Sequence, residues 1–550
     1  PDLVHAVKPE PNHEMPQAAS AHDTFWDFIS LMPESMHMIM WVMSDRAIPR
    51  SLRMMEGFGV HTFRFINTNN ESHFVKFHWK PKLGTHAVVW DEAQKISGKN
   101  SDFHRQDLWE AIDSGAFPEW ELGVQIIPEA DEHKYDFDLL DPTKLVPEEL
   151  VPVQLIGKMV LDKNPDNFFA ETEQVAFHPG HLVPGIDFTN DPLLQGRLFS
   201  YTDTQLSRLG SPNFHEIPIN RPINSMHNNQ RDGHMRQEIN KGRVSYHPNS
   251  LGGGCPYQAK IEEGGFHSFN ERIDAQKVRE RSESFSDHFS QATMFYKSMT
   301  KVEQDHIIKA LRFELGKVET VAIRNRMLGL LSIVNKTFAE KVAQGLGLKV
   351  PKPEKPMNEG VGANPDPKQE SVIKKPTIDK SSALTMIDNP NNSKTIATRQ
   401  IAFLCSAGVD DNSVNEMKKT LEKEGAMVKI IGPHLGVIKS SANKEIEVDQ
   451  SFLIASSVLF DAVYVPQNKN DFGDSNNEAI DFINESYIHC KPIAIDNPKQ
   501  SVIPKTKIDF KAKQNADMGI ILKSELENKT SSTFIKAIGQ HRFWNREEEL

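Results

Sequence analysis

The sequence predicts a multi-domain chain of the α+β class, with antiparallel strands first, helices next and an α/β domain at the end. Three observations predict this order. Apolar and polar residues alternate with a period of two over residues 59–67 and 72–80, as they do in half-buried strands. Apolar residues recur at i, i+3 and i+4 over residues 302–312 and 316–330, as they do on the buried face of a helix. After residue 399, short apolar runs alternate with helical segments, which favours a parallel sheet with helices on both faces.

Composition limits the functions that the chain can have. A chain of 550 residues with 38% hydrophobic content can form several cores. Its formal net charge of −12 argues against a nucleic acid or a membrane surface as a partner. The sequence has no apolar run of about 18 residues, so no membrane span is expected. The three cysteines, Cys255, Cys405 and Cys490, are odd in number and far apart, which predicts reduced thiols and a cytoplasmic protein.

The chain divides into five segments. Residues 1–222 carry the alternating strands, including two more at 122–128 and 151–161. Residues 223–290 are polar and aperiodic, so we expect them to wrap over other elements. Residues 291–350 are helical. Residues 351–398, which contain seven prolines and no aromatic residue, are expected to be a linker that buries no core, and residues 399–550 form the α/β domain.

The pattern of the last segment predicts a flavodoxin-like domain with a parallel sheet. Ser413 and Glu416 have the spacing of a capping box, so they are expected to begin the first helix, and Gly425 is expected to end it. The expected strands are residues 401–405, 427–431, 462–465, 492–495 and 519–522.

One helix carries the most informative pair of side chains. Asp191 followed by Pro192 predicts a helix that begins at Pro192 and runs to about Leu209, where Gly210 ends it. Arg197 and Tyr201 then share one face, and a guanidinium against a phenol oxygen favours the phenolate, an anionic ligand for ferric iron. Tyrosine is a known axial ligand of haem. The alternative is that Tyr201 and its neighbour Phe199 only pack on an amphipathic helix.

The letters around this pair resemble the proximal haem segment of the monofunctional haem catalases. They read R-L-F-S-Y-T-D-T at 197–204, V-P-G-I-D at 183–187 and N-F-x-E-I-P-I-N-R-P at 213–222. The resemblance is nearly gap-free from Pro1 to about Gly347, and the large-subunit type fits best because it has an extra C-terminal α/β domain. It implies an eight-stranded barrel whose other strands lie upstream of Pro1, so the chain is expected to be N-terminally truncated.

The resemblance also implies the chemistry. It implies a haem-dependent catalase that decomposes hydrogen peroxide to water and dioxygen and so protects against oxidative stress. One peroxide oxidises the haem, and a second reduces it and leaves as dioxygen. Tyr201 is expected to be the axial ligand of the haem iron, and Arg197 is expected to lower the basicity of its phenolate. The cofactor is expected to be haem b, or haem b oxidised to haem d, without NADPH, in a homotetramer.

Further site residues follow from the same resemblance. His178 is expected to contact the haem and to bond covalently to Cβ of Tyr201, although a turn histidine is otherwise an ordinary hydrogen-bonded residue. Phe177, Val60 and His61 are expected to be haem neighbours, and the alternative for His61 is a satisfied, half-buried histidine. Two charged residues, Arg46 and Glu56, resemble those that line a lateral channel, and an isolated surface ion pair is the alternative.

Two rival functions remain open. The distal histidine and asparagine of the family are expected upstream of Pro1, so no catalytic residue is assigned within the chain, and the rival is a truncated, non-catalytic haem-binding scaffold. The C-terminal segment also resembles class I glutamine amidotransferase-like folds, which place a nucleophilic cysteine after a strand reading K-P-I-A. Here Asp496 follows that strand, and Cys490 precedes it. The sequence therefore predicts a catalytically silent domain that packs on the core and guards the haem access route.

Overall fold

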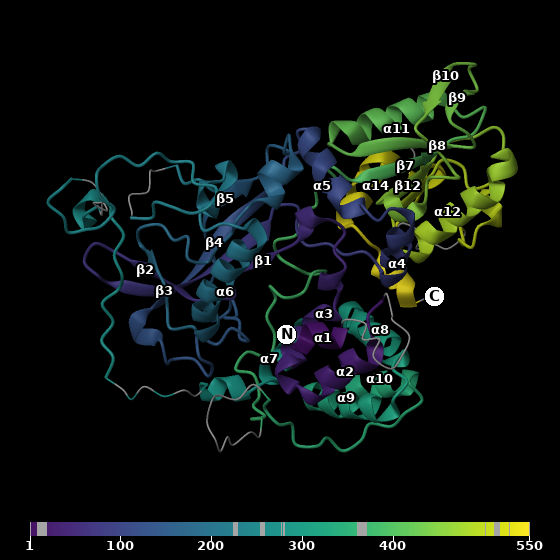
Figure 1. The fold of residues 1–550 in the computed structure, drawn as a ribbon. Helices are drawn as coiled ribbons and strands as arrows, with labels where there is room; N and C mark the ends of the chain where they lie inside the picture. Colours follow the sequence, from purple (N-terminus) through teal and green to yellow (C-terminus); the bar gives the residue numbers. More distant parts are fainter. Residues whose placement is uncertain are drawn as a thin grey trace.

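The protein consists of an antiparallel sheet, a cluster of helices and a C-terminal parallel sheet, which Figure 1 shows as three adjoining bodies. The computed structural model describes residues 2–7, 19–223, 229–252, 259–274, 276, 278, 281–359, 371–500, 502–510, 517–526 and 529–548. Residue Cys255 lies outside these ranges.

The antiparallel sheet has the strand order β5-β4-β3-β2-β6, and β1 also pairs with β3. Phe63 pairs with Val75 and Ile66 with Ser72, so β2 and β3 form the expected hairpin around the Asn-rich turn. Phe74 and Val75 in the middle of β3 are fully buried. The expected half-barrel of antiparallel strands is confirmed. The strands are β1 (Gly57–Phe58), β2 (Phe63–Ile66), β3 (Ser72–Pro81), β4 (Glu119–Pro128), β5 (Gln154–Val160) and β6 (Ile186–Asp187).

The helical cluster draws its core from two distant parts of the chain. Trp26, Met36 and Met40 are fully buried against Leu311 and Phe338, so the N-terminal helices pack with those that follow residue 290 rather than with the sheet. None of the helices in the described ranges is long and apolar enough to cross a membrane. The helices of this cluster are α1 (Asp2–Val7), α2 (His22–Leu31), α3 (Met36–Val42), α7 (Ser290–Ser298), α8 (Lys301–Gly316), α9 (Val321–Val334) and α10 (Lys336–Gly345).

The two segments predicted to lack regular structure behave differently from one another. The described part of residues 223–278 is mostly exposed and contains no strand or α-helix, as expected for a wrapping segment. The end of the predicted segment differs, because residues 284–290 are mostly buried and α7 begins at Ser290. The described part of residues 351–398 also has no helix or strand, but the expectation that it buries no core is wrong. Leu384 belongs to the core of the helical cluster and Ile396 to that of the C-terminal domain. Aliphatic side chains supply this burial, which a count of aromatic residues cannot detect.

The C-terminal sheet has the order β11-β8-β7-β12-β13-β14, and its neighbouring strands are parallel. Helices α11 and α14 pack on one face and α12 on the other, as predicted. The predicted capping box is wrong: the side chain of Asp410 caps α11, and Ser413 lies inside the helix. The elements are β7 (Gln400–Leu404), α11 (Asp411–Lys423), β8 (Met427–Gly432), β9 (Gly436–Lys439), β10 (Glu445–Val448), β11 (Gln450–Ser451), β12 (Ala462–Val465), α12 (Asn476–Ile488), β13 (Ile493–Ile495), β14 (Ile520–Leu522), α13 (Lys523–Leu526) and α14 (Thr530–Gln540).

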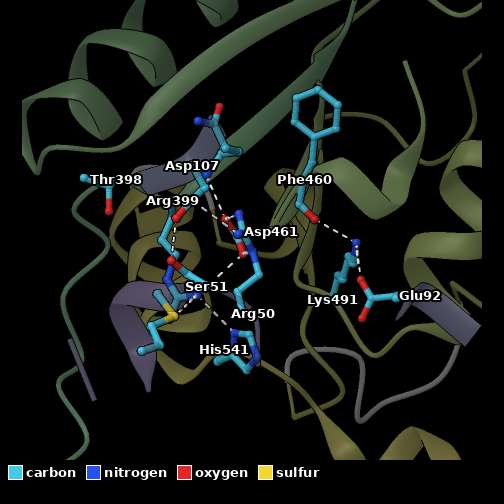
Figure 2. Close-up of polar contacts among 12 residues, drawn as sticks. Arg50, Ser51, Glu92, Asp107, Thr398, Arg399, Phe460, Asp461, Lys491 and His541 are labelled. Atoms are coloured by element: carbon cyan, nitrogen blue, oxygen red, sulfur yellow. Dashed lines mark hydrogen bonds and ion pairs between the residues drawn. The ribbon is translucent and has the colours of Figure 1, made fainter. Parts of the chain in front are cut away.

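Buried ion pairs join the C-terminal domain to the first part of the chain, next to α4 (Trp90–Lys99) and α5 (Phe103–Asp113). Figure 2 shows the guanidinium of Arg50 facing Asp461, at 2.7 Å and 2.9 Å to its two oxygens. Nearby, the carboxylate of Glu92 accepts from Lys491 at 2.6 Å and from Arg542 at 3.2 Å. Because a buried charge is costly without its partner, these pairs fix one position of the two bodies relative to each other.

Candidate haem site

Helix α6 (Pro192–Leu209) carries the predicted site, and its start is fixed by one carboxylate. Oδ1 of Asp191 accepts hydrogen bonds from the amides of Leu193 at 2.9 Å and Leu194 at 3.0 Å. Pro192 takes the first helical position, where a missing N–H costs nothing, and Gly210 ends the helix at φ 70°. The predicted boundaries of this helix are confirmed.

The same carboxylate ties α6 to the antiparallel sheet. Oδ2 of Asp191 accepts a hydrogen bond from Nδ1 of His61 at 2.7 Å, and both side chains are buried. Thr189 adds a second tie, because its hydroxyl donates to the carbonyl oxygen of Thr62 at 2.6 Å. His61 is therefore a satisfied histidine, as in the alternative that the sequence analysis gave, although it is buried and not half-buried. Its expected place beside a haem stays a prediction. His61 positions the helix from its first turn.

Arg197 and Tyr201 lie together on α6, as their spacing predicts. Nη2 of Arg197 donates to the phenol oxygen of Tyr201 at 2.5 Å, and the guanidinium carbon lies 4.6 Å from the centre of the phenol ring. A cation is thus directed at the atom where a phenolate carries its negative charge, which suits an oxygen ligand for a hard ferric ion. Phe199 is 77% exposed, so the alternative in which it packs on the helix is wrong.

The residues around Tyr201 fit a flat, largely apolar group with an iron at its centre. Tyr201 is itself partly exposed, and Phe177, the residue before the His178 that lies beside Tyr201, leaves 76% of its surface open. An accessible, polarised phenol oxygen and an exposed apolar side chain in the same part of the chain fit a haem with a tyrosine ligand. Tyr201 would hold the iron of such a group, and Arg197 would stabilise the ligand.

His178 contacts Tyr201 and is held in one orientation. Its Nε2 donates to the carbonyl oxygen of Leu198 at 3.1 Å and to the hydroxyl of Thr202 at 2.9 Å, while its Nδ1 accepts from the amide of Gly180 at 2.8 Å. The centres of the His178 and Tyr201 rings are 6.2 Å apart, with the planes at 78°. The histidine is thus positioned beside the ring of Tyr201 by Leu198 and Thr202 of the same helix.

Val60 and Phe177 are the other two residues predicted to contact the haem. Val60 is 46% exposed, and its carbonyl oxygen accepts from Nζ of Lys76 at 2.9 Å. The backbone next to His178 is anchored as well, because Nε2 of Gln205 donates to the carbonyl oxygen of Phe177 at 3.0 Å. The sequence analysis missed Gln205, and a glutamine one helical turn beyond Tyr201 is the only signal that could have indicated it.

Arg46 and Glu56 form an ion pair, with Nη1 and Oε2 3.2 Å apart. The side chains are largely buried, so the alternative of an isolated surface ion pair is wrong, and their expected place in a lateral channel stays a prediction. Arg46 also donates through Nη2 to the carbonyl oxygen of Leu384 at 2.8 Å, and its guanidinium lies 4.9 Å from the centre of the Trp41 ring. Burial raises the pKa of Glu56, although Arg46 opposes this.

The C-terminal domain does not present a reactive thiol among its described residues. Cys490 is fully buried, and burial raises the pKa of its thiol to about 12. Burial also raises the pKa of Cys405. Asp496, which follows β13 at the position of the elbow, accepts hydrogen bonds from the hydroxyl of Tyr464 at 2.9 Å and the amide of Gln467 at 3.2 Å. A carboxylate held in this way serves as a structural acceptor.

Family models match three parts of the chain. A model described as "Catalase" matches residues 1–253, one described as "Catalase-related immune-responsive" matches residues 282–346, and one described as "C-terminal domain found in long catalases" matches residues 397–548. The first and third contain the Tyr201 helix and the parallel sheet, respectively.

Relatives match the chain over its whole length. "Catalase HPII" of Pseudomonas putida is 54% identical and covers 100% of this chain, which spans 74% of that protein. "Catalase" of Alkalihalophilus pseudofirmus is 52% identical and "Catalase-2" of Bacillus subtilis 51%, and in each case 99% of this chain aligns with 76% of the relative. With this identity across both sheets and the helical cluster, the chain belongs to the catalase family.

Proposed function

We propose that the protein is a haem-dependent catalase that decomposes hydrogen peroxide to water and dioxygen and thereby protects the cell from oxidative stress. The observation that carries the proposal is the contact between Arg197 and the phenol oxygen of Tyr201. Both residues lie within the part of the chain that matches the catalase family model. In this proposal the phenol oxygen of Tyr201 is the anionic ligand that the reaction needs.

Each residue of the site has a separate task in this proposal. When bound, haem supplies the iron and the porphyrin that exchange electrons with peroxide. Tyr201 binds the iron through its phenolate oxygen, and Arg197 stabilises that charge with a charge-assisted hydrogen bond. Asp191 and His61 hold the first turn of α6 on the sheet. The helix that carries Tyr201 therefore keeps one position relative to the sheet. Phe177 and Val60 contribute apolar surface beside the group.

The modified forms of the site are part of the same proposal. The contact between the His178 and Tyr201 rings supports a covalent bond between a ring nitrogen and Cβ of Tyr201. Its formation would remove one hydrogen from Cβ and one from the imidazole, and one hydrogen peroxide would take up both hydrogens and both electrons to give two waters. If the bonding nitrogen is Nδ1, it would also give up the hydrogen bond from Gly180. The cofactor in this proposal is haem b or haem d, and hydrogen peroxide would be the oxidant that converts the first into the second. Arg46 and Glu56 line a lateral channel in this proposal, and the burial of their ion pair supports such a place.

The C-terminal domain has a structural role in this proposal. The strand order β8-β7-β12-β13-β14 supports a flavodoxin-like, doubly wound domain. Its buried thiols and the engaged carboxylate of Asp496 support a domain without hydrolase or amidotransferase activity. We further propose a homotetramer in the cytoplasm that works without NADPH, nucleic acid or membrane. The reduced thiols Cys405 and Cys490 are consistent with that location.

An oxygen electrode tests the proposed function directly. Haem-loaded protein mixed with hydrogen peroxide should release one dioxygen for every two peroxides consumed, without an added electron donor. A protein that binds haem but releases no dioxygen would instead support the rival reading, a non-catalytic haem-binding scaffold. Consumption of peroxide only when an organic donor is present would contradict both.

A further inference from the structure

A short segment of the chain lies along α6 and leads to His178. The segment comprises residues 173–178, and residues 175–178 are neither helix nor strand. Its first residue contacts Arg208 in the last turn of α6, whereas His178 contacts Leu198 and Thr202 earlier in the helix. The segment therefore runs in the direction opposite to α6, and its last residue lies beside Tyr201. We call residues 173–178 the flanking segment.

Arg208 binds the main chain of the flanking segment at two points. Its Nη1 donates to the carbonyl oxygen of Glu173 at 2.5 Å, and its Nη2 donates to that of Val175 at 2.5 Å. A guanidinium can hold both oxygens because its N–H groups lie in one plane and point in fixed directions, whereas the ammonium group of a lysine is a single point charge. The two carbonyl groups are therefore held together at the end of α6.

Arg208 also fixes the side-chain amide of Gln205, which is buried. Nη2 of Arg208 donates to Oε1 of Gln205 at 2.5 Å. The amide oxygen is thus engaged, and the amide nitrogen is the group that donates to the carbonyl oxygen of Phe177 at 3.0 Å. Arg208 therefore acts on Phe177 through Gln205, one residue before His178.

Asn220 holds two further residues of the flanking segment. Its Oδ1 accepts a hydrogen bond from the amide of Ala176 at 2.7 Å, and its Nδ2 donates to the carbonyl oxygen of Gln174 at 2.8 Å. Nδ2 also donates to the carbonyl oxygen of Phe214 at 3.0 Å, in the short turn that follows α6. Asn220 is therefore fixed relative to the helix, and it holds the segment to the same end of α6 as Arg208 does.

We propose that Arg208 and Asn220 are positioning residues for the haem site. With Gln205, they bind every residue from 173 to 177 through a main-chain carbonyl or amide group. Side chains thus satisfy backbone groups that a sheet would otherwise pair, so the loss of one side chain frees part of the segment. The ring of His178 stays beside Tyr201 while the segment keeps its register on α6. The inference rests on the proposed function, since it takes Tyr201 as the haem ligand and His178 as the residue that bonds to it.

Hydrogen exchange of the complete, haem-free chain tests the positioning apart from the reaction. In Arg208→Ala, the peptide of residues 173–178 should exchange about 5-fold to 160-fold faster, the effect of two hydrogen bonds at about 2-fold to 13-fold each. The peptide at the start of α6 should not change. Arg208→Lys should resemble Arg208→Ala, because it keeps the charge and loses the planar fork. Arg105→Ala, which removes an exposed arginine of α5, should resemble the wild type. Unchanged exchange of the flanking segment in Arg208→Ala, or wild-type exchange in Arg208→Lys, would contradict the proposal.

Mass spectrometry of the haem-loaded protein after exposure to hydrogen peroxide tests the consequence for the site. In the wild type, the peptides that contain His178 and Tyr201 should be recovered joined and two hydrogens lighter than their sum. The joined fraction should fall in Arg208→Ala and in Asn220→Ala, while the bound haem should stay, because the contact between Arg197 and Tyr201 is not altered. Melting curves identify variants that do not fold.

A joined fraction equal to that of the wild type in both folded variants would overturn the positioning role. A wild type without any joined peptides would show that the proposed bond between His178 and Tyr201 does not form. In that case the exchange of the flanking segment alone decides whether Arg208 holds it on α6.

Discussion

Replacing Asp191 with alanine removes three hydrogen bonds at the start of the haem-site helix. The amides of Leu193 and Leu194 lose the acceptor that satisfies them, and the buried Nδ1 of His61 loses its only hydrogen-bond partner among the described residues. The first turn of α6 is expected to fray, and the anchor of the helix on the sheet is expected to weaken. Tyr201 lies ten residues further along the same helix, so its phenol oxygen shifts or becomes mobile.

The size of this effect follows from the two losses. Removal of an N-cap costs about 0.5–2 kcal/mol. A buried group left without its partner costs about 1–3 kcal/mol, and the side chain of His61 is 6% exposed. The sum is roughly 1.5–5 kcal/mol, which corresponds to an increase of about 13-fold to 5,000-fold in the opening equilibrium.

Hydrogen exchange followed by mass spectrometry measures that opening locally. In Asp191→Ala, the peptide containing Leu193 and Leu194 should exchange faster by a factor in this range, and less haem should be retained at a given concentration. Asp191→Asn is the matched control, because its amide oxygen still caps the helix and its amide group keeps a polar partner beside Nδ1 of His61. Unchanged exchange in Asp191→Ala would refute the anchoring role of the carboxylate.

Three further predictions concern the rest of the molecule. Arg197→Ala should keep the fold but lower peroxide turnover by about 10-fold to 150-fold, the effect of one charge-assisted hydrogen bond, and an unchanged turnover number would mean that the arginine does not tune Tyr201. Cys405→Ser and Cys490→Ser should leave turnover unchanged, because both thiols are buried, and loss of an activity with either would contradict the silent C-terminal domain. Although burial opposes it, Asp45 and Glu547 raise the pKa of His306 to about 10, so the stability that its charge contributes is complete below pH about 6.5 and is lost as the pH rises to about 10. The midpoint of thermal unfolding should therefore fall over that interval more steeply in the wild type than in His306→Gln, and equal slopes would show that this ion pair is not coupled to folding.

Features encoded by neighbouring residues could be predicted from the sequence. Asp191, Pro192 and Gly210 mark the ends of one helix, because capping, proline and glycine preferences act within a single turn. The contact between Arg197 and Tyr201 follows from their separation of one helical turn.

Contacts between distant residues could not be predicted in the same way. His61 and Asp191 are 130 positions apart, and the role of His61 depends on the pairing of β6 with β2. The burial of Leu384 depends on the helical cluster that covers it. The start of α11 could not be predicted either, because Asp410 and Ser413 are both good N-cap residues. In the structure the amide of Asn412 bonds to the side chain of Asp410.

If Tyr201 binds the haem iron as proposed, vibrational spectroscopy of the haem-loaded protein detects its phenolate. Resonance Raman spectra excited in the phenolate-to-iron charge-transfer band should show phenolate ring modes in the wild type. These modes should be absent in Tyr201→Phe, together with most of the bound haem and the release of dioxygen. Tyr246→Phe, which alters an exposed tyrosine, should behave like the wild type. Phenolate modes and dioxygen release that persist in Tyr201→Phe would contradict the assignment.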